Sequence, residues 1–177
     1  MVQKSVNIRT YAESMLKGRM AETLFEELMR QSDNIVYRFG YEAIVQNLTQ
    51  LEEKFDRYSK VGERIRAIPD FIVIDRRGNP EFVEVKFRWD GRLDSNRDKQ
   101  RLANLLKYWE AKFIVVNCSE QPYFRISNPP YMGKNGNFVW KPLVDEAGWK
   151  IDPKIYREYE ELVHRYLTPT RIPPMSA

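Results

Sequence analysis

Hydrophobic and polar positions alternate most clearly in the middle of the chain, where two apolar segments flank the tripeptide Arg76-Arg77-Gly78. An alternation with a period of two is typical of strands, and a three-residue loop that ends in glycine is typical of a type I turn followed by a bulge. The pattern therefore predicts a β-hairpin, with strands from Ile65 to Asp75 and from Glu81 to Trp89.

The loop sets the register of this hairpin. If Asp75 faces Asn79 across the loop, then Asp70 faces Glu84, and directly opposed residues share a face with their Cβ atoms roughly 5 Å apart. Lys86 lies two residues beyond Glu84 and is expected to point to the same side. A longer loop would shift the register and separate the three side chains, so the site prediction depends on this loop. The opposite face is apolar and consists of Phe71, Val73, Val83, Val85 and Phe87.

Two carboxylates and one ammonium at a single point suit a divalent cation beside a water molecule. Carboxylate oxygens are preferred ligands of Mg²⁺ and Mn²⁺, so we expect Asp70, Glu84 and the Val85 carbonyl to hold such a cation. Lys86 would orient the attacking water or neutralise charge that develops on a phosphate. This chemistry predicts cleavage of a phosphodiester, whereas the plain alternative is an exposed strand face with alternating charges.

The segment from about Ala12 to Arg30 has apolar residues at helical spacing. Glu22 falls at the edge of the apolar stripe and is within reach of a metal site, whereas Glu26 and Glu27 are expected to turn towards water. An ordinary amphipathic helix with a flanking charge is the alternative explanation. The stripe consists of Ala21, Leu24, Phe25 and Leu28.

Together these residues resemble the PD-(D/E)XK nuclease superfamily, which has the restriction-endonuclease-like fold. Pro69-Asp70 and Glu84-Val85-Lys86 match its signature, and Glu22 matches the glutamate that many members carry on the first core helix. The segment from Lys17-Gly18 to Glu22 looks like the opening of archaeal Holliday-junction resolvases and related small nucleases. The resemblance covers roughly residues 15–117 and implies an α/β fold, a three-layer core with a central mixed β-sheet flanked by helices.

The resemblance also implies a function and further site residues. Glu22 would complete the metal shell directly or through water, and Gln100 is a weaker catalytic candidate because related nucleases often place a glutamine early on the following helix. The expected activity is Mg²⁺- or Mn²⁺-dependent hydrolysis of DNA by an endonuclease, with structure-selective or resolvase-like cleavage among the options. A nucleic-acid-binding protein that keeps the fold without cleaving and an RNA-directed nuclease stay open as alternatives.

Other segments complete the expected order of helix, strand, hairpin, helix and strand. Ser95 is suited to cap a helix, with Asp98 at the third position supporting its first turn. The short apolar run from Phe113 to Asn117 is typical of a central strand covered on both faces. We also expect a strand at 34–39, a helix at about 43–60, and a buried stripe of Leu102, Leu105, Leu106 and Trp109 on the helix after Ser95.

The sequence changes character after residue 118. Prolines, glycines and aromatic residues alternate there, which predicts a loop-rich segment packed onto the core. Asp152-Pro153 predicts the start of a last helix, whose docking stripe is Ile155, Tyr159, Leu162, Val163 and Tyr166. We therefore expect a single nuclease domain over 1–167, with its core at about 15–117 and an elaboration at 118–167, followed by a proline-rich tail at 168–177.

Basic residues are concentrated directly after the expected site. The net charge of the 177-residue chain is only +4, a value that permits nucleic-acid binding without requiring it. Basic residues next to a metal site would meet the phosphates on either side of the scissile bond. The alternative for each of them is a solvated helix face. The expected nucleic-acid contacts are Arg88, Arg92, Arg97, Lys99 and Arg101.

Composition narrows the remaining classes. Hydrophobic residues make up 42% and charged residues 31%, which is typical of a soluble globular domain. A single cysteine, Cys118, excludes an internal disulfide and is expected to be a buried thiol, and the single histidine, His164, is expected near the surface. No apolar run is long enough to cross a membrane, so an intracellular, cytoplasmic protein is expected. Cleavage of two strands often requires two sites, which makes a homodimer one option.

Overall fold

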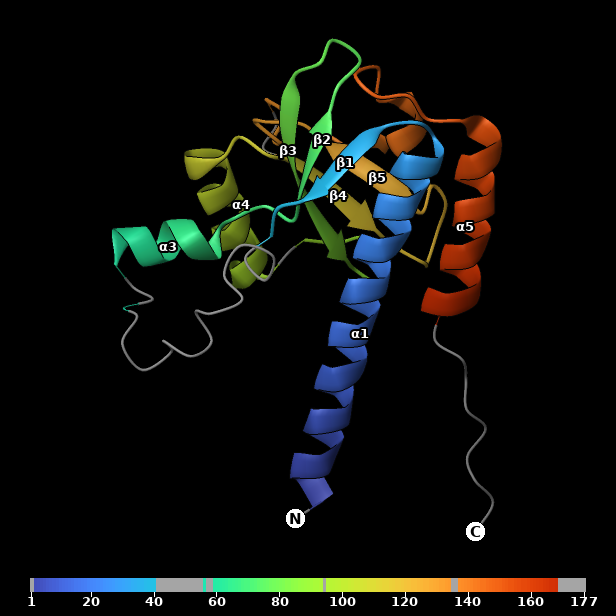
Figure 1. Ribbon diagram of the computed structural model, residues 1–177. Coiled ribbons are helices and arrows are strands. Elements are labelled where there is room, and N and C mark those ends of the chain that lie inside the picture. The colour runs from blue at the N-terminus through green and yellow to red at the C-terminus, as the bar shows by residue number, and fades with distance from the viewer. Residues whose placement is uncertain (1, 41–55, 57–58, 94, 135–136, 169–177) are drawn as a thin grey trace.

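The computed structural model describes residues 2–40, 56, 59–93, 95–134 and 137–168. These residues form a mixed β-sheet with helices on both faces (Figure 1). The elements are α1 (Val2–Gln31), β1 (Ile35–Arg38), α3 (Lys60–Arg66), β2 (Phe71–Ile74), β3 (Pro80–Phe87), α4 (Asn96–Tyr108), β4 (Lys112–Val116), β5 (Phe124–Ser127), β6 (Lys141–Pro142), the 3-10 helix η2 (Leu143–Asp145) and α5 (Pro153–Leu167).

The strand order in the six-stranded sheet follows the chain, from β1 to β6. β3 and β4 run parallel because α4 connects them as a crossover, and the other neighbouring strands are antiparallel. β3 therefore lies inside the sheet, between β2 and β4. The prediction of an α/β structure with a mixed sheet is confirmed, and so is the order of helix, strand, hairpin, helix and strand.

The hairpin of β2 and β3 has the predicted register. Phe71 pairs with Val83 and Ile74 with Pro80, and the Asp75 amide donates to the Asn79 carbonyl at 2.9 Å. Gly78 takes a φ of 86°, the left-handed conformation that glycine adopts without steric cost. The same pairing continued by one residue places Asp70 across from Glu84.

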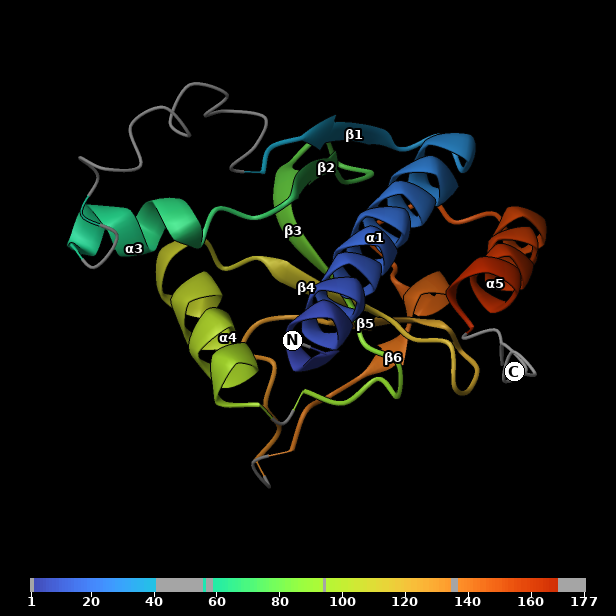
Figure 2. The same cartoon turned by 90° about the horizontal axis from the view of Figure 1, so that it is seen from below.

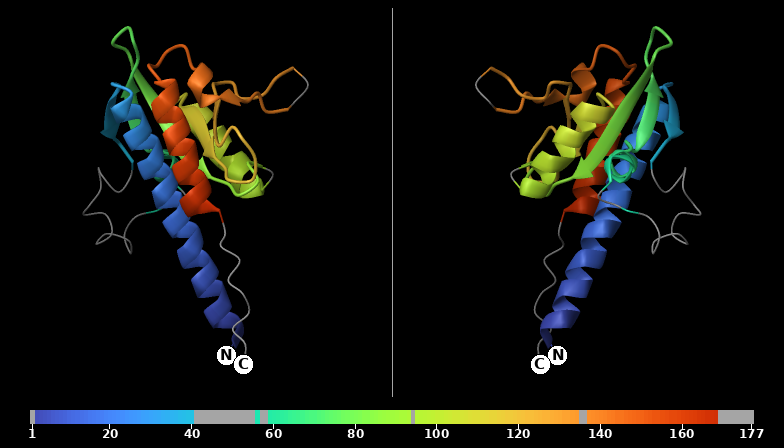
Figure 3. Two further views of the ribbon diagram at one scale, coloured as in Figure 1. Left: turned by 90° about the vertical axis from the view of Figure 1, so that its right-hand side faces the viewer. Right: turned by 90° about the vertical axis from the view of Figure 1, so that its left-hand side faces the viewer.

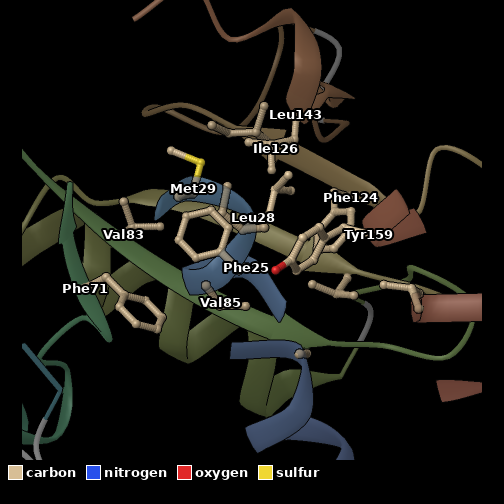
Figure 4. Packing of buried hydrophobic residues seen from close by; sticks show 14 of the residues in the cluster. Phe25, Leu28, Met29, Phe71, Val83, Val85, Phe124, Ile126, Leu143 and Tyr159 are labelled. Atoms are coloured by element: carbon tan, nitrogen blue, oxygen red, sulfur yellow. The ribbon is translucent and has the colours of Figure 1, made fainter. Parts of the chain in front are cut away.

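One face of the sheet is covered by α1 and α5, which lie side by side (Figures 2 and 3). Figure 4 shows side chains from α1, the sheet and α5 meeting in this layer. Phe25 and Leu28 of α1 are fully buried there, as are Phe71 and Val83 of the hairpin. The apolar hairpin face predicted from the sequence is therefore the face that packs against α1. The first turns of α1 extend beyond the other elements (Figure 3).

The opposite face of the sheet is covered by α4 and by the segment around Tyr131. Leu102 and Leu105 of α4 pack with Phe113 and Val115 of β4 in a second buried cluster. Ser95 caps α4 as predicted, since its hydroxyl accepts the Asp98 amide at 3.1 Å. The described chain therefore has three layers, with α1 and α5 on one side of the sheet and α4 on the other (Figure 2).

The predicted strand from Ile65 to Asp75 is too long at its start. Residues 60–66 form α3 instead, because the Ser59 hydroxyl accepts the Gly62 amide and caps a short helix. β2 begins only at Phe71. Most of the helix predicted at 43–60 and the tail at 169–177 lie outside the described residues.

Two helix stripes differ from the prediction in one residue each. Leu106 of α4 is 37% exposed and Tyr166 of α5 is 54% exposed, whereas Tyr156 is buried. Its hydroxyl donates to the Phe124 carbonyl at 3.2 Å, so α5 turns this residue and not Tyr166 towards the sheet. Asp152 caps α5 by accepting the Lys154 amide, as predicted.

The segment after residue 118 is more regular than predicted. It adds β5 and β6 to the sheet, because β5 pairs with β4 along its whole length and β6 pairs with β5. It also includes the short helix η2. Trp149 confirms the predicted packing of aromatic residues onto the core: it is 1% exposed, lies 6.2 Å from the Phe25 ring, and donates from Nε1 to Glu81 at 2.7 Å. Lys112 links Glu81 and Glu146 at 2.8 and 3.1 Å.

The predicted settings of the single cysteine and the single histidine are confirmed. Cys118 is buried, and burial raises the pKa of its thiol to about 11. His164 is exposed on α5, where its Nδ1 lies 3.2 Å from the Tyr123 hydroxyl.

Candidate functional site

Asp70 directly precedes β2, and its carboxylate lies against β3. Oδ2 accepts a hydrogen bond from the Val85 amide at 2.8 Å. The Asp70 carbonyl accepts the amides of Phe39 and Gly40, just after β1, at 2.9 and 3.0 Å. Main chain and side chain are thus fixed to the strands on either side, which leaves little freedom for the carboxylate.

Glu84 lies in the middle of β3 and is fully buried. Lys86 lies two residues further along the strand, with its Nζ 3.4 Å from Glu84 Oε1. The Lys86 side chain is 37% exposed, so it connects the buried carboxylate with solvent. The structure therefore brings Asp70, Glu84 and Lys86 together, as the hairpin register predicted.

The pKa of the Asp70 carboxyl reflects this crowding. Burial raises it well above its usual range, and the nearby carboxylates of Glu84 and Glu22 raise it further. The Val85 amide and the Lys86 ammonium act in the opposite direction but do not cancel the rise. A carboxylate with this environment gains from any added positive charge, which is the property expected of a cation ligand.

Glu22 approaches this group from α1, in the layer on the other side of the sheet. It is partly buried, as its place at the edge of the helical stripe predicted. Its charge affects the pKa of Asp70, and such effects act over longer distances than direct coordination. In the part of the chain that the structure describes, no three Asp, Glu, His or Cys side chains are close enough to form a metal-binding group. The effect of Glu22 on Asp70 that the structure records is the effect of its charge.

Arg101 of α4 contacts Glu84, a role that the sequence did not predict. Its Nε and Nη2 donate to Glu84 Oε1 and Oε2 at 3.0 and 2.9 Å, a bidentate pair. Burial lowers the pKa of Arg101, but the charge and hydrogen bonds of Glu84 together with the charge of Asp70 outweigh burial, so the pKa is raised. The residue expected to contact nucleic acid is therefore the main partner of the buried carboxylate.

Gln100 lies on a different face of α4 from Arg101. It is exposed, and its amide donates to Asn104 on the same helix at 3.1 Å. At 100° per residue, Gln100 points away from the buried Leu102 and Leu105, whereas Arg101 borders Leu105. Helical periodicity was therefore a usable signal for Arg101, and the structure does not bring the predicted catalytic candidate Gln100 to the carboxylates.

The other predicted nucleic-acid contacts have different surroundings. Arg88 is engaged with Asp98, the residue that supports the first turn of α4. Arg92 is 75% exposed and lies 3.7 Å from Asp90, and Lys99 is also exposed. Arg97 belongs to α4, but its side chain is outside the described part. Among the described residues of this stretch, Arg92 and Lys99 are therefore solvent-exposed cations.

Glu26 does not turn towards water as predicted. It is 6% exposed and accepts from Arg38 Nε at 2.7 Å, while Arg30 lies 2.9 Å away. Arg38 comes from β1, so burial of this carboxylate depends on a pairing between helix and strand that a helical pattern does not contain. Two cations offset the cost of burying one carboxylate.

Comparisons of the chain with protein-family models, with curated proteins and with solved structures found no match. Within the described residues, every helix is too short or too polar to cross a membrane. The geometry of Asp70, Glu84, Lys86 and their neighbours is therefore the basis for a proposed function.

Proposed function

We propose that this chain is a divalent-metal-dependent nuclease that hydrolyses phosphodiester bonds of DNA, with a PD-(D/E)XK site on a restriction-endonuclease-like core. The observation that carries the proposal is the juxtaposition of Asp70 with Glu84 and Lys86 on paired strands. The raised pKa of Asp70 adds support, because it reflects burial and, beside it, the nearby carboxylates of Glu84 and Glu22, which Lys86 does not fully offset.

The fold supports the same proposal. The core implied by the resemblance has the order helix, strand, hairpin, helix and strand, and the described elements α1, β1, β2, β3, α4 and β4 follow it. The crossover between the parallel strands β3 and β4 is α4, whose Arg101 contacts Glu84 of the hairpin, and this helix carries most of the basic residues that closely follow Lys86. Basic side chains next to the carboxylates suit a polyanionic substrate.

The donor atoms fit Mg²⁺ or Mn²⁺. Asp70 and Glu84 offer hard carboxylate oxygens and Val85 a carbonyl oxygen, and water would complete the shell. Glu22, on the far side, would act through water or by its charge. When bound, such a cation would polarise the scissile phosphate and lower the pKa of a water molecule bound to it.

Lys86 is placed to act on the substrate. Its ammonium is held near Glu84 and partly exposed, so it can reach both the carboxylates and an approaching phosphate. A cation in that place would position the attacking water and offset charge that grows on the phosphate in the transition state.

One observation favours the alternative of a nucleic-acid-binding protein without cleavage. Both oxygens of Glu84 are occupied by Arg101, so this carboxylate already has a counterion. If Arg101 stayed paired with Glu84, Glu84 could not bind a cation together with Asp70.

Cleavage assays separate these functions. Labelled junction, flap, single-stranded and duplex DNA, and RNA of matched sequence, are incubated with Mg²⁺ or Mn²⁺ and with EDTA. We expect DNA cleavage that requires the cation, that disappears in Asp70→Ala, and that falls roughly 10²–10³-fold in Lys86→Ala, the usual effect of losing one transition-state donor.

Matched control variants are Asp145→Ala and Lys134→Ala, which remove the same side-chain types at exposed positions far along the chain. They should cleave like the unmodified protein. Undiminished cleavage in Asp70→Ala and Lys86→Ala would refute the site, cleavage restricted to RNA would change the substrate class, and cation-independent binding without cleavage would favour the binding protein.

A further inference from the structure

Arg101 connects three segments that meet at Glu84. Besides its two bonds to the carboxylate, Nη1 donates to the Arg66 carbonyl at the end of α3, and Nη2 donates to the Ile68 carbonyl at 3.3 Å. Those carbonyls belong to the segment that leads into Asp70. The guanidinium is thus held by the main chain on one side and by Glu84 on the other, with 25% of its side chain exposed.

Glu84 has no exposed surface in this arrangement. Its Oε1 faces Arg101 Nε and Lys86 Nζ, and its Oε2 faces Arg101 Nη2. A hard divalent cation binds through the same oxygen lone pairs that these donors use. These three donors face the roughly four lone-pair sites of the carboxylate, and Glu84 has no exposed surface, so a cation can reach its oxygens only if at least one of these contacts opens.

We propose that Arg101 competes with the divalent cation for Glu84: the guanidinium holds the carboxylate in the cation-free protein and releases at least one oxygen when the cation binds. This inference rests on the proposed function, since it concerns the same site. Arg66 and Ile68 keep the released guanidinium beside the site, because their carbonyls are separate acceptors from the carboxylate.

A purely positioning role for Arg101 predicts the opposite result. In that case the bidentate pair would orient Glu84 for the cation, and loss of the guanidinium would weaken cation binding. In competition, loss of the guanidinium strengthens cation binding, because a favourable contact of the cation-free state disappears. The sign of the change in affinity distinguishes the two roles.

Isothermal titration of the full chain with Mn²⁺, without nucleic acid, measures this sign. We expect the affinity to rise on the order of tenfold in Arg101→Met, the size of effect that one partly screened charge contact produces, with a smaller rise in Arg101→Lys. Arg77→Met is the matched control, since it removes an exposed arginine in the hairpin loop, and its affinity should stay within about twofold. An unchanged or lower affinity in Arg101→Met overturns the proposal.

Loss of one partner of a buried pair destabilises a protein, so a second measurement uses the unmodified chain. The side-chain Nε–H of Arg101 gives its own NMR resonance, assigned by its loss in Arg101→Lys. Addition of Mg²⁺ should shift this resonance and also the resonance of the Val85 amide, which donates a hydrogen bond to Asp70. A shift of both signals supports the competition.

The two signals also separate this inference from the proposed function. If Mg²⁺ shifts the Val85 amide but leaves Arg101 Nε–H unchanged, a cation binds without displacing Arg101, and only the competition is refuted. If neither signal moves and no variant takes up Mn²⁺, both the competition and the metal-dependent nuclease are refuted.

Discussion

Asp70 is held where its ionised form is unfavourable. Burial, Glu84 and Glu22 all raise its pKa, and the Val85 amide and Lys86 compensate only in part. A carboxyl whose pKa is raised in the folded state contributes stability that is complete below its unfolded pKa and is lost as the pH rises through the folded pKa. Without a cation, ionisation of Asp70 in the folded protein is therefore unfavourable, and its contribution to stability is lost as the pH rises.

Asp70→Asn should accordingly stabilise the cation-free protein at pH 7. Urea unfolding in EDTA should show a gain of about 0.5–2 kcal/mol, the usual range for relief of an unfavourable charge. The gain should shrink as the pH falls through the raised pKa of Asp70, because the carboxyl of the unmodified protein is then neutral, as the amide of the variant is at every pH.

Asp75→Asn is the control with the opposite sign. Hydrogen bonds from the Asn79 side chain and amide lower the pKa of Asp75, so its ionised form stabilises the loop. This variant should lose stability at pH 7, and the loss should fade as the pH falls through the lowered pKa of Asp75. Equal behaviour of the two variants would contradict the assignment of charge at Asp70.

Single-residue roles were predictable from the sequence where the relevant contacts are local. Asp70, Glu84 and Lys86 lie on one hairpin, so the period of the strand and the length of the loop determine which side chains meet. Arg101 reaches Glu84 across a helix crossover, so helical periodicity places Arg101 beside the buried stripe of α4 but does not identify its partner. The same limit applies to Glu26, whose cation Arg38 comes from a strand.

At the scale of elements, the hairpin loop controls the alignment of the site. Gly78→Ala should destabilise the protein by about 1–2 kcal/mol, since a side chain disfavours the left-handed conformation at this position. Nothing lies within 4 Å of the added methyl group, so the cost comes from the backbone alone. Chemical denaturation measures the change.

Gly18→Ala is the matched control, because this glycine lies in α1 and its added methyl group is also free of contacts. Alanine favours the helix, so this variant should be more stable by up to about 1 kcal/mol. A loss of stability at both positions would show that contacts, and not backbone conformation, decide the outcome.

Elements with local signals were predicted better than elements defined by their neighbours. Caps at Ser95 and Asp152 and the glycine of the hairpin loop are encoded within a few residues. The predicted strand began at Ile65 and so included the end of α3, because a short run with alternating apolar residues is compatible with either structure. β5 forms by pairing with β4, and β6 forms by pairing with β5, and the proline-rich sequence around them gave no sign of either pairing.

At the scale of the whole molecule, the charges available to a polyanion are fewer than the sequence indicates. Arg88 and Arg101 are engaged with Asp98 and Glu84, whereas Arg92 and Lys99 are exposed. Only cations that replace counterions on the nucleic acid contribute to the salt dependence of binding.

Arg92→Ala and Lys99→Ala, each placed in Asp70→Ala to prevent cleavage, should each reduce the slope of log affinity against log salt by about 1. Fluorescence anisotropy with duplex DNA between roughly 50 and 200 mM KCl measures the slope. Arg157→Ala on α5, across the sheet from α4, is the control and should leave the slope unchanged. A change in Arg157→Ala equal to that in Arg92→Ala would place the nucleic acid elsewhere.

The docking of Trp149 has a consequence for the smallest fragment that can fold. Its ring fills the core beside Phe25, and its Nε1 bonds Glu81 on the strand that carries Glu84. A chain shortened to the region that bears the nuclease signature, ending near residue 117, would leave Phe25 and the β4 edge uncovered. The boundary of an expressible domain therefore lies beyond α5, and β3, which carries Glu84 and Lys86, depends on a segment that contains none of the signature residues.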